Sequence, residues 1–125
     1  MASIRDQQLA IAAAVSAASL GFTVSDLPPT QPRAGVGWVN VGRVTIGQTL
    51  RTADCTFTVV LVLGADARKA DEQLTILPVP LINALTTGAL HAGDVAVEPA
   101  TLPAGDVSPA QLYALFVTLT LEVDS

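Results

Sequence analysis

The chain has 125 residues, of which 50% are hydrophobic but only 4% are aromatic, and it carries a formal net charge of −5. This length predicts a single domain, residues 1–125, that buries about 65% of the surface exposed by the unfolded chain. The six basic residues are scattered along the sequence, which argues against the basic stripe that tight nucleic-acid binding requires.

The N-terminal segment "MASIRDQQLAIAAAVSAASLG" predicts a helix. Ser3 is the expected N-cap, Asp6 the acid of a capping box, and Gly21 the residue that ends the helix. Polar residues at positions 6–8 interrupt the charged-then-apolar order of a secretory signal, so we interpret this segment as part of the fold. No run of about 20 apolar residues occurs, so we expect no membrane-spanning helix and no membrane partner.

A short alternating strand, "FTVSD", precedes the proline-rich stretch "LPPTQPRAG". Prolines fix the backbone in an extended form and remove donors, so this stretch does not join the middle of a sheet. It is either a plain connection or a stiff arm that docks on a neighbouring subunit. In the second case Leu27, Pro28, Pro29 and Arg33 are interface residues.

Two longer strands are predicted to form an antiparallel hairpin. The first is "VGWVNVGRVTI", in which Gly42 is expected to mark a bulge. Trp38 is expected in the core or on a strand face, with an aromatic binding platform at an interface as the alternative. The second is "TFTVVLVLG", whose alternation places Phe57, Val59, Leu61 and Leu63 on one face and residues 58, 60 and 62 on the other.

Helical periodicity follows this strand. Asp66 is the expected N-cap, and Pro78 is expected to end the helix near Ile76 because proline lacks the N–H that the helix needs. A second, short helix is predicted to begin with Pro80 and to stop at Gly88.

Near the C-terminus, Val95 and Val97 predict a short strand, and residues 98–109 predict a long loop rich in Pro, Gly and Ala. The chain closes with the alternating strand "LYALFVTLTLEVD". The only charged residues of this loop are Glu98 and Asp106, which are candidate interface residues. Either this last strand, with Phe116, or the strand containing Trp38 is expected at a subunit boundary, because free strand edges pair readily.

The residues that usually carry chemistry are too few for a catalytic or metal site. His91 is the only histidine and Cys55 the only cysteine, so the usual nitrogen and sulfur ligands of zinc lack their minimum set. Cys55 is expected to be a small buried hydrophobic residue. No serine lies in a G-x-S-x-G turn. We therefore predict no enzyme activity, no catalytic residues, no metal and no cofactor.

These elements together predict an α+β fold, a mostly antiparallel sheet with helices packed on one face. The segment "VVLVLGADARKADEQL", the lead-in "PPTQPRAGVGWV", the preceding helix and the closing strand resemble the tail terminator proteins of long-tailed bacteriophages, especially those of actinobacterial hosts. The resemblance covers most of the chain in the order and length of its elements.

The resemblance implies a virion protein, made in the host cytoplasm, that forms a ring of itself, usually a hexamer. Such a ring caps the tail tube, stops its growth and joins it to the head-tail connector or stopper protein, while DNA passes through the lumen without specific binding. In such a ring we expect the loop over residues 98–109, with Glu98 and Asp106, to face the lumen or a tube-facing rim. The positive mean hydropathy agrees either with surface meant for burial against other chains or with a core that is simply rich in Ala and Val. The alternatives are another neck or tail-completion protein of the connector, and a small ligand-binding module.

Overall fold

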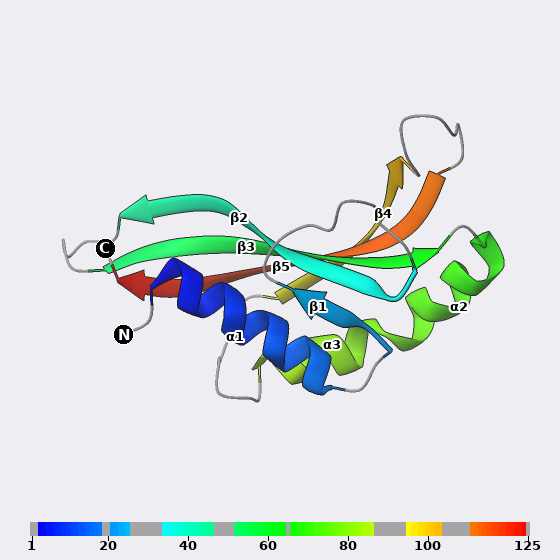
Figure 1. The fold of residues 1–125 in the computed structure, drawn as a ribbon, viewed down its shortest axis with the longest axis horizontal. Helices are drawn as coiled ribbons and strands as arrows, with labels where there is room; N and C mark the ends of the chain where they lie inside the picture. The colour runs from blue at the N-terminus through cyan, green and yellow to red at the C-terminus, as the bar shows by residue number, and fades with distance from the viewer. Residues whose placement is uncertain are drawn as a thin grey trace.

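The computed structural model describes residues 3–18, 21–25, 34–46, 52–64, 66–86, 95–103 and 111–124. Its elements are, in chain order, α1 (Ile4–Ala17), β1 (Thr23–Ser25), β2 (Val36–Ile46), β3 (Thr52–Gly64), α2 (Ala67–Ile76), α3 (Pro78–Thr86), β4 (Val95–Pro103) and β5 (Gln111–Asp124). The five strands form one sheet in the order β1-β2-β3-β5-β4 (Figure 1). Only the β1–β2 pair is parallel. The predicted α+β class and mostly antiparallel sheet are confirmed.

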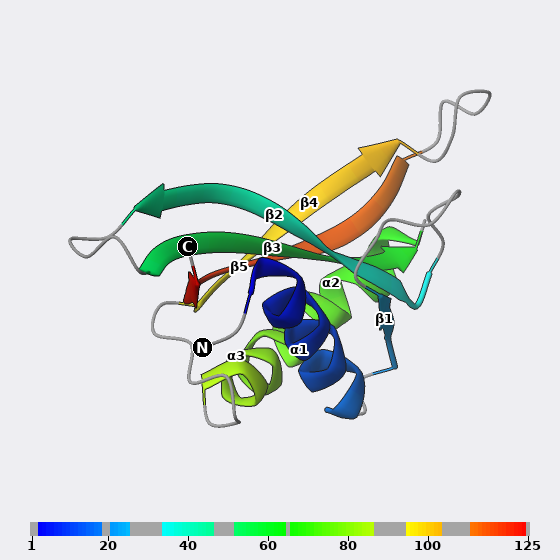
Figure 2. The same ribbon diagram turned by 60° about the vertical axis from the view of Figure 1, so that its left-hand side comes forward.

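The main core lies between the sheet and the helices, which are on the same side of the sheet in Figure 2. Alternate residues of β3 and β5 fill this core together with apolar residues of α1 and α3. Its largest fully buried side chains are those of Phe57, Ile11, Leu61, Leu81, Leu85, Leu115 and Leu119. Val60 and Val62 belong instead to a second cluster, so the alternation predicted for β3 is confirmed.

Helix α1 begins with the predicted capping box. The Asp6 N–H donates to Ser3 Oγ at 3.2 Å, and the Ser3 N–H donates to Asp6 Oδ2 at 3.3 Å. The predicted end at Gly21 is wrong, because α1 ends at Ala17. Gly21 has a φ of 91°, a left-handed conformation that suits glycine, and it therefore serves the turn into β1.

Helices α2 and α3 follow each other with one residue between them. Asp66 is the predicted N-cap, and α2 ends at Ile76 as expected. The predicted start of the next helix at Pro80 is wrong, since α3 begins at Pro78. Proline is favoured at the first helical position, where its missing N–H has no intrahelical acceptor. The predicted stop at Gly88 lies outside the described residues.

Strands β2 and β3 form the predicted antiparallel pair, and the register shifts between Val41 and Val44. This shift confirms the irregularity expected at Gly42. The prediction of a loop over residues 98–109 is wrong at its start, because β4 continues to Pro103. β4 is an edge strand, where proline is tolerated because the side away from the neighbour needs no donor. Residues 104–110 lie outside the described part of the chain.

Candidate interaction surface

The face of the sheet opposite the main core carries no helix among the described residues (Figure 2). We call it the helix-free face. Strand register and alternation assign to it Trp38, Asn40 and Thr45 of β2, Asp54, Thr56, Thr58, Val60 and Val62 of β3, Ala96, Glu98 and Ala100 of β4, and Leu112, Ala114, Phe116, Thr118 and Thr120 of β5.

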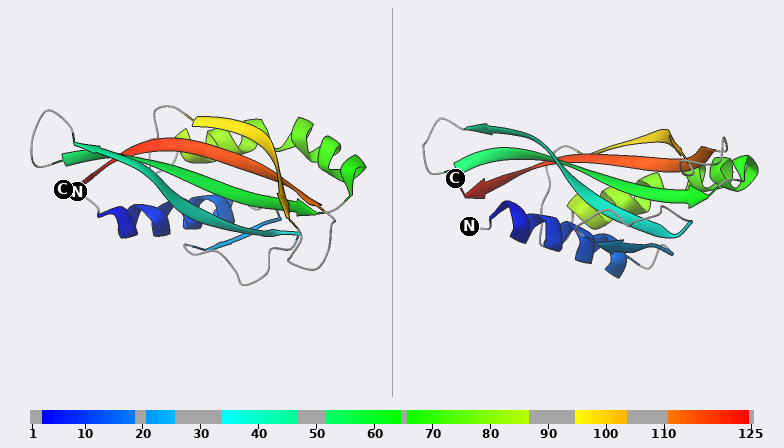
Figure 3. Two further views of the ribbon diagram at one scale, coloured as in Figure 1. Left: turned by 90° about the horizontal axis from the view of Figure 1, so that it is seen from above. Right: turned by 45° about the horizontal axis from the view of Figure 1, so that its top comes forward.

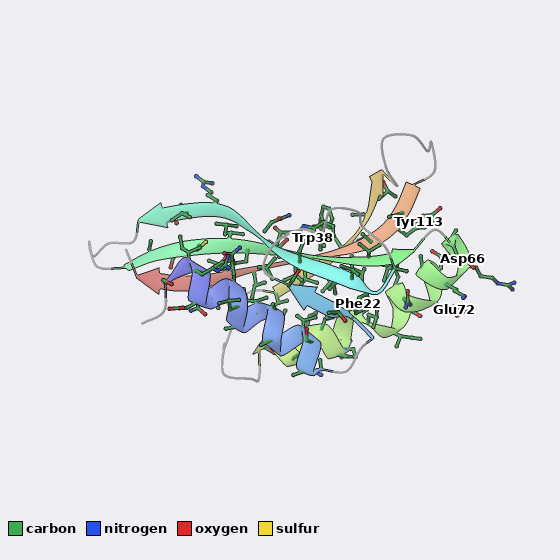
Figure 4. The ribbon with its side chains drawn as sticks, in the orientation of Figure 1. Phe22, Trp38, Asp66, Glu72 and Tyr113 are labelled. Carbon is green, nitrogen blue, oxygen red and sulfur yellow. The ribbon has the colours of Figure 1, made fainter. Side chains whose placement is uncertain are left out.

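One end of the helix-free face is apolar. Trp38, Val60, Val62, Leu112 and Ala114 form a buried cluster there, against which Phe116 packs. Trp38 is only 7% exposed, and Figure 4 shows it on β2, in the middle of the sheet. Most of the indole surface is thus buried within the chain.

Three predicted interface residues lie in one row on this face. The row crosses four strands and consists of Trp38, Val60, Phe116 and Glu98. Phe116 is half-buried and Glu98 is exposed. The other predicted interface residues, Leu27, Pro28, Pro29, Arg33 and Asp106, lie outside the described residues, as does His91.

The other end of the helix-free face is lined by hydroxyl groups. Thr56 and Thr120 face each other across β3 and β5, with their Oγ1 atoms 3.3 Å apart. Thr45 donates from its hydroxyl to the carbonyl oxygen of Asp54 at 3.4 Å. This end of the face offers neutral hydrogen-bonding groups and the carboxylate of Asp54.

Besides the outer sides of β1 and β4, two stretches of the sheet lack a second strand neighbour in the described part of the chain. β1 pairs with β2 only as far as Trp38, so residues 39–46 of β2 have a strand neighbour on one side only. β4 pairs with β5 only as far as Leu119, which leaves residues 120–124 with β3 alone. Figure 3 shows β2, β3 and β5 extending together beyond β4, toward the end of the sheet at which α1 begins.

A buried side chain from α1 covers the first free group on the β2 edge. Gln8 is 9% exposed, and its Nε2 donates to the carbonyl oxygen of Val39 at 3.1 Å. Past this contact, Val41 and Val44 are 41% and 47% exposed. Sequence reasoning missed both as surface residues, because valine alternation predicts a strand but does not reveal which neighbours the strand has.

Exposed apolar side chains also occur on the helices. Leu9 lies on α1, while Ile76 and Val79 lie on either side of the short break between α2 and α3. Ile76 and Val79 are 64% and 66% exposed, the highest values among the large exposed hydrophobic residues.

The described residues bring together little reactive chemistry. Cys55 is fully buried, as predicted, and burial raises the pKa of its thiol. Within the described ranges, no three side chains of His, Cys, Asp or Glu are grouped as metal ligands. None of the described helices has both the length and the apolar character needed to cross a membrane.

The chain matches no protein-family model and no curated protein in sequence comparisons.

Proposed function

We propose that this chain is a structural virion protein, a tail terminator that forms a ring at the end of a phage tail tube and joins the tube to the head-tail connector. The observation that carries the proposal is the pair of free strand edges on opposite sides of one sheet. An edge on each side allows identical subunits to continue the sheet from copy to copy, which is the head-to-tail contact that generates a ring.

The distribution of charge supports a DNA-conducting lumen lined by the helix-free face. Of the described basic residues, Arg5 lies in α1, Arg68 and Lys69 lie in α2, and Arg43 lies at the β2 bulge. The residues that strand register assigns to the helix-free face include Asp54 and Glu98, and the described basic residue beside this face is Arg43, opposite Thr56. Phosphate contacts would add affinity through counterion release and slow the passage of DNA. A neutral to acidic wall avoids that affinity.

The tail tube protein and the connector or stopper protein are the proposed partners at the two ends of the ring, with six copies as the proposed number. Exposed Ile76 and Val79 are apolar positions suited to contact with one of these partners. The proposal requires no catalytic residue, metal or cofactor.

The test is deletion of the gene from the phage that carries it, with the chain supplied from a plasmid as the control. We expect headless tails with tubes of uncontrolled length, restored to normal virions by the plasmid. Headless tubes of normal length would instead indicate another neck or tail-completion protein. Normal virions without the chain would refute a role in the virion.

A further inference from the structure

We infer that the subunits join by parallel pairing between β2 of one copy and the last residues of β5 in the next copy. This inference deepens the proposed ring and rests on it for the closed, cyclic arrangement. The pairing itself is argued from the sheet, and the partner is a second copy of this chain.

The two outermost strands of the sheet are poor sites for pairing. β1 has only three residues, and β4 contains Pro99 and Pro103, which lack backbone donors. Short edge strands and prolines are devices that block edge-to-edge association. Residues 39–46 of β2 and 120–124 of β5 contain no proline, and they lie on opposite sides of the three strands that extend beyond β4.

The outward-pointing backbone groups on β2 follow from the Gln8 contact. Because Gln8 reaches the Val39 carbonyl from α1, the backbone groups of Val39 point away from β3. The backbone N–H and C=O groups of successive residues point to opposite sides of a strand. Those of Val41, two residues after Val39, therefore also point away from β3. After the one-residue bulge, Val44 is opposite Cys55 and Ile46 is opposite Ala53. The backbone groups of Val44 and Ile46 therefore also point away from β3.

The outward groups on β5 follow from the same alternation, carried across β3. Phe57 is opposite Val41, so its backbone groups turn toward β5 and bond to Leu119. Leu119 therefore points its groups toward β3. The backbone groups of Thr120, Glu122 and Asp124 must then point to the free edge.

The outward residues of β2 and β5 can bond to each other in a parallel or an antiparallel pair. Only the parallel pair keeps the helices of all copies on the same side of the continued sheet. The outward residues of β2 belong to the rows of Val59, Phe57 and Cys55, which face the helices. The outward residues of β5 belong to the rows of the helix-free face, as the Thr56–Thr120 pair shows. In a parallel pair, the backbone groups of a residue bond to the two residues before and after the one directly beside it. The bonding residues of the two strands therefore carry their side chains on opposite faces of the sheet, as the outward residues of β2 and β5 do. An antiparallel pair would place the helices of successive copies on alternate sides.

The direction of the strands agrees with this requirement. β2 and β5 are both antiparallel to β3, so they run parallel to each other within one copy. Rotation about an axis along the strands preserves that direction and brings β5 of one copy beside β2 of the next. Cyclic symmetry and the alternation of backbone groups therefore both favour a parallel pair between β2 of one copy and β5 of the next.

The residue types at the two edges are complementary. The rows of the sheet place Val44 level with Cys55 and Leu121, so continuing the rows sets the exposed Val44 beside Leu121 of the neighbour. Arg43 precedes Val44 in β2, while the free end of β5 contributes the acidic Glu122 and Asp124. Pairing therefore covers an exposed apolar side chain and brings opposite charges to the same boundary.

A disulfide trap tests this register. Thr45 and Glu122 share a row through Asp54, so two cysteines at these positions would be adjacent across the boundary between copies. Within one copy β3 separates them by two strand spacings, about 9.6 Å, which is too far for a disulfide. We expect oxidised Thr45→Cys/Glu122→Cys protein, in a Cys55→Ala background, to give a ladder of covalent oligomers up to a closed ring.

The matched control is Asn40→Cys/Glu122→Cys, because Asn40 is on the same face and strand but in the row of Thr118. It should give no ladder. The pairing would be refuted if rings appeared in electron micrographs without a Thr45/Glu122 ladder, or if both cysteine pairs gave equal ladders. Neither result would refute the proposed ring. A specific ladder from a protein that fails to cap tail tubes would uphold the pairing and refute the terminator role.

Charge reversal gives a second test without cysteines. Arg43→Glu should weaken self-association at least tenfold, and Arg43→Glu/Glu122→Lys should restore much of it. Unchanged association in the single variant, shown to be folded by circular dichroism, would contradict the proposed boundary.

Discussion

Gly37 is the most closely packed of the described glycines and lies between β1 and β3. A Cβ atom there would lie 2.7 Å from Leu61 Cδ2, 2.8 Å from the Val60 carbonyl oxygen and 3.2 Å from Val24 Cγ2. The Val60 oxygen is part of the backbone and cannot rotate away. We expect Gly37→Ala to lower the free energy of unfolding by about 2 kcal/mol, measured by chemical denaturation.

Asn40→Ala is the matched control for this substitution, since Asn40 is an exposed residue of the same strand. Its effect should stay within about 0.5 kcal/mol. Equal stability of Gly37→Ala and the parent protein would show that β1 and β3 do not close on β2 as tightly as these distances require.

Cys55 links stability to pH. Burial raises the pKa of the Cys55 thiol, so the folded protein holds this proton more tightly than the unfolded chain does. The protonated thiol therefore makes its full contribution to the free energy of unfolding at pH values below the ordinary pKa of a thiol. This contribution is lost as the pH rises through the raised pKa of Cys55. We expect the free energy of unfolding to fall over this alkaline range by more in the parent protein than in Cys55→Ala. Parallel curves for the two proteins would refute the link.

Helix α2 is stabilised at its start by Asp66, which is labelled at the beginning of the helix in Figure 4. Its Oδ1 accepts hydrogen bonds from the N–H groups of Arg68 at 3.0 Å and Lys69 at 3.3 Å. Asp66→Ala should cost about 1 kcal/mol of unfolding free energy, because two helix donors lose their acceptor. Asp71→Ala removes the same charge from an exposed position of α2 and should change stability by less than about 0.5 kcal/mol. Equal losses would mean that charge rather than capping is responsible.

The elements that could be predicted from the sequence are those fixed by local interactions. Ser3, Asp6 and Asp66 cap helices through contacts within four residues, and strand alternation depends only on the period of the chain. The length of β4 could not be predicted, because Pro99 and Pro103 are compatible with a strand only at an edge of the sheet. Strand order is set by contacts between distant parts of the chain.

The same limit applies to the candidate surface. The sequence singled out Trp38, Phe116 and Glu98, and strand register places all three in one row. It could not single out the exposed Val41 and Val44, which lie past the point where the described β1 pairing ends at Trp38.

At the scale of the whole molecule, the free edges and the helix-free face lead to one arrangement. Copies joined edge to edge would keep their helices on one side and turn the hydroxyl-lined face toward a common channel. An assembly of this kind uses residues 39–46 of β2 and 120–124 of β5 once per subunit, while the outer sides of β1 and β4 stay outside the pairing.

Electron microscopy of the purified chain mixed with tail tubes of the same phage tests this account most directly. We predict a closed ring with a central channel at one end of each tube, with the helices on its outer side. Bare tube ends, with the chain present only as single copies at high concentration, would contradict the account.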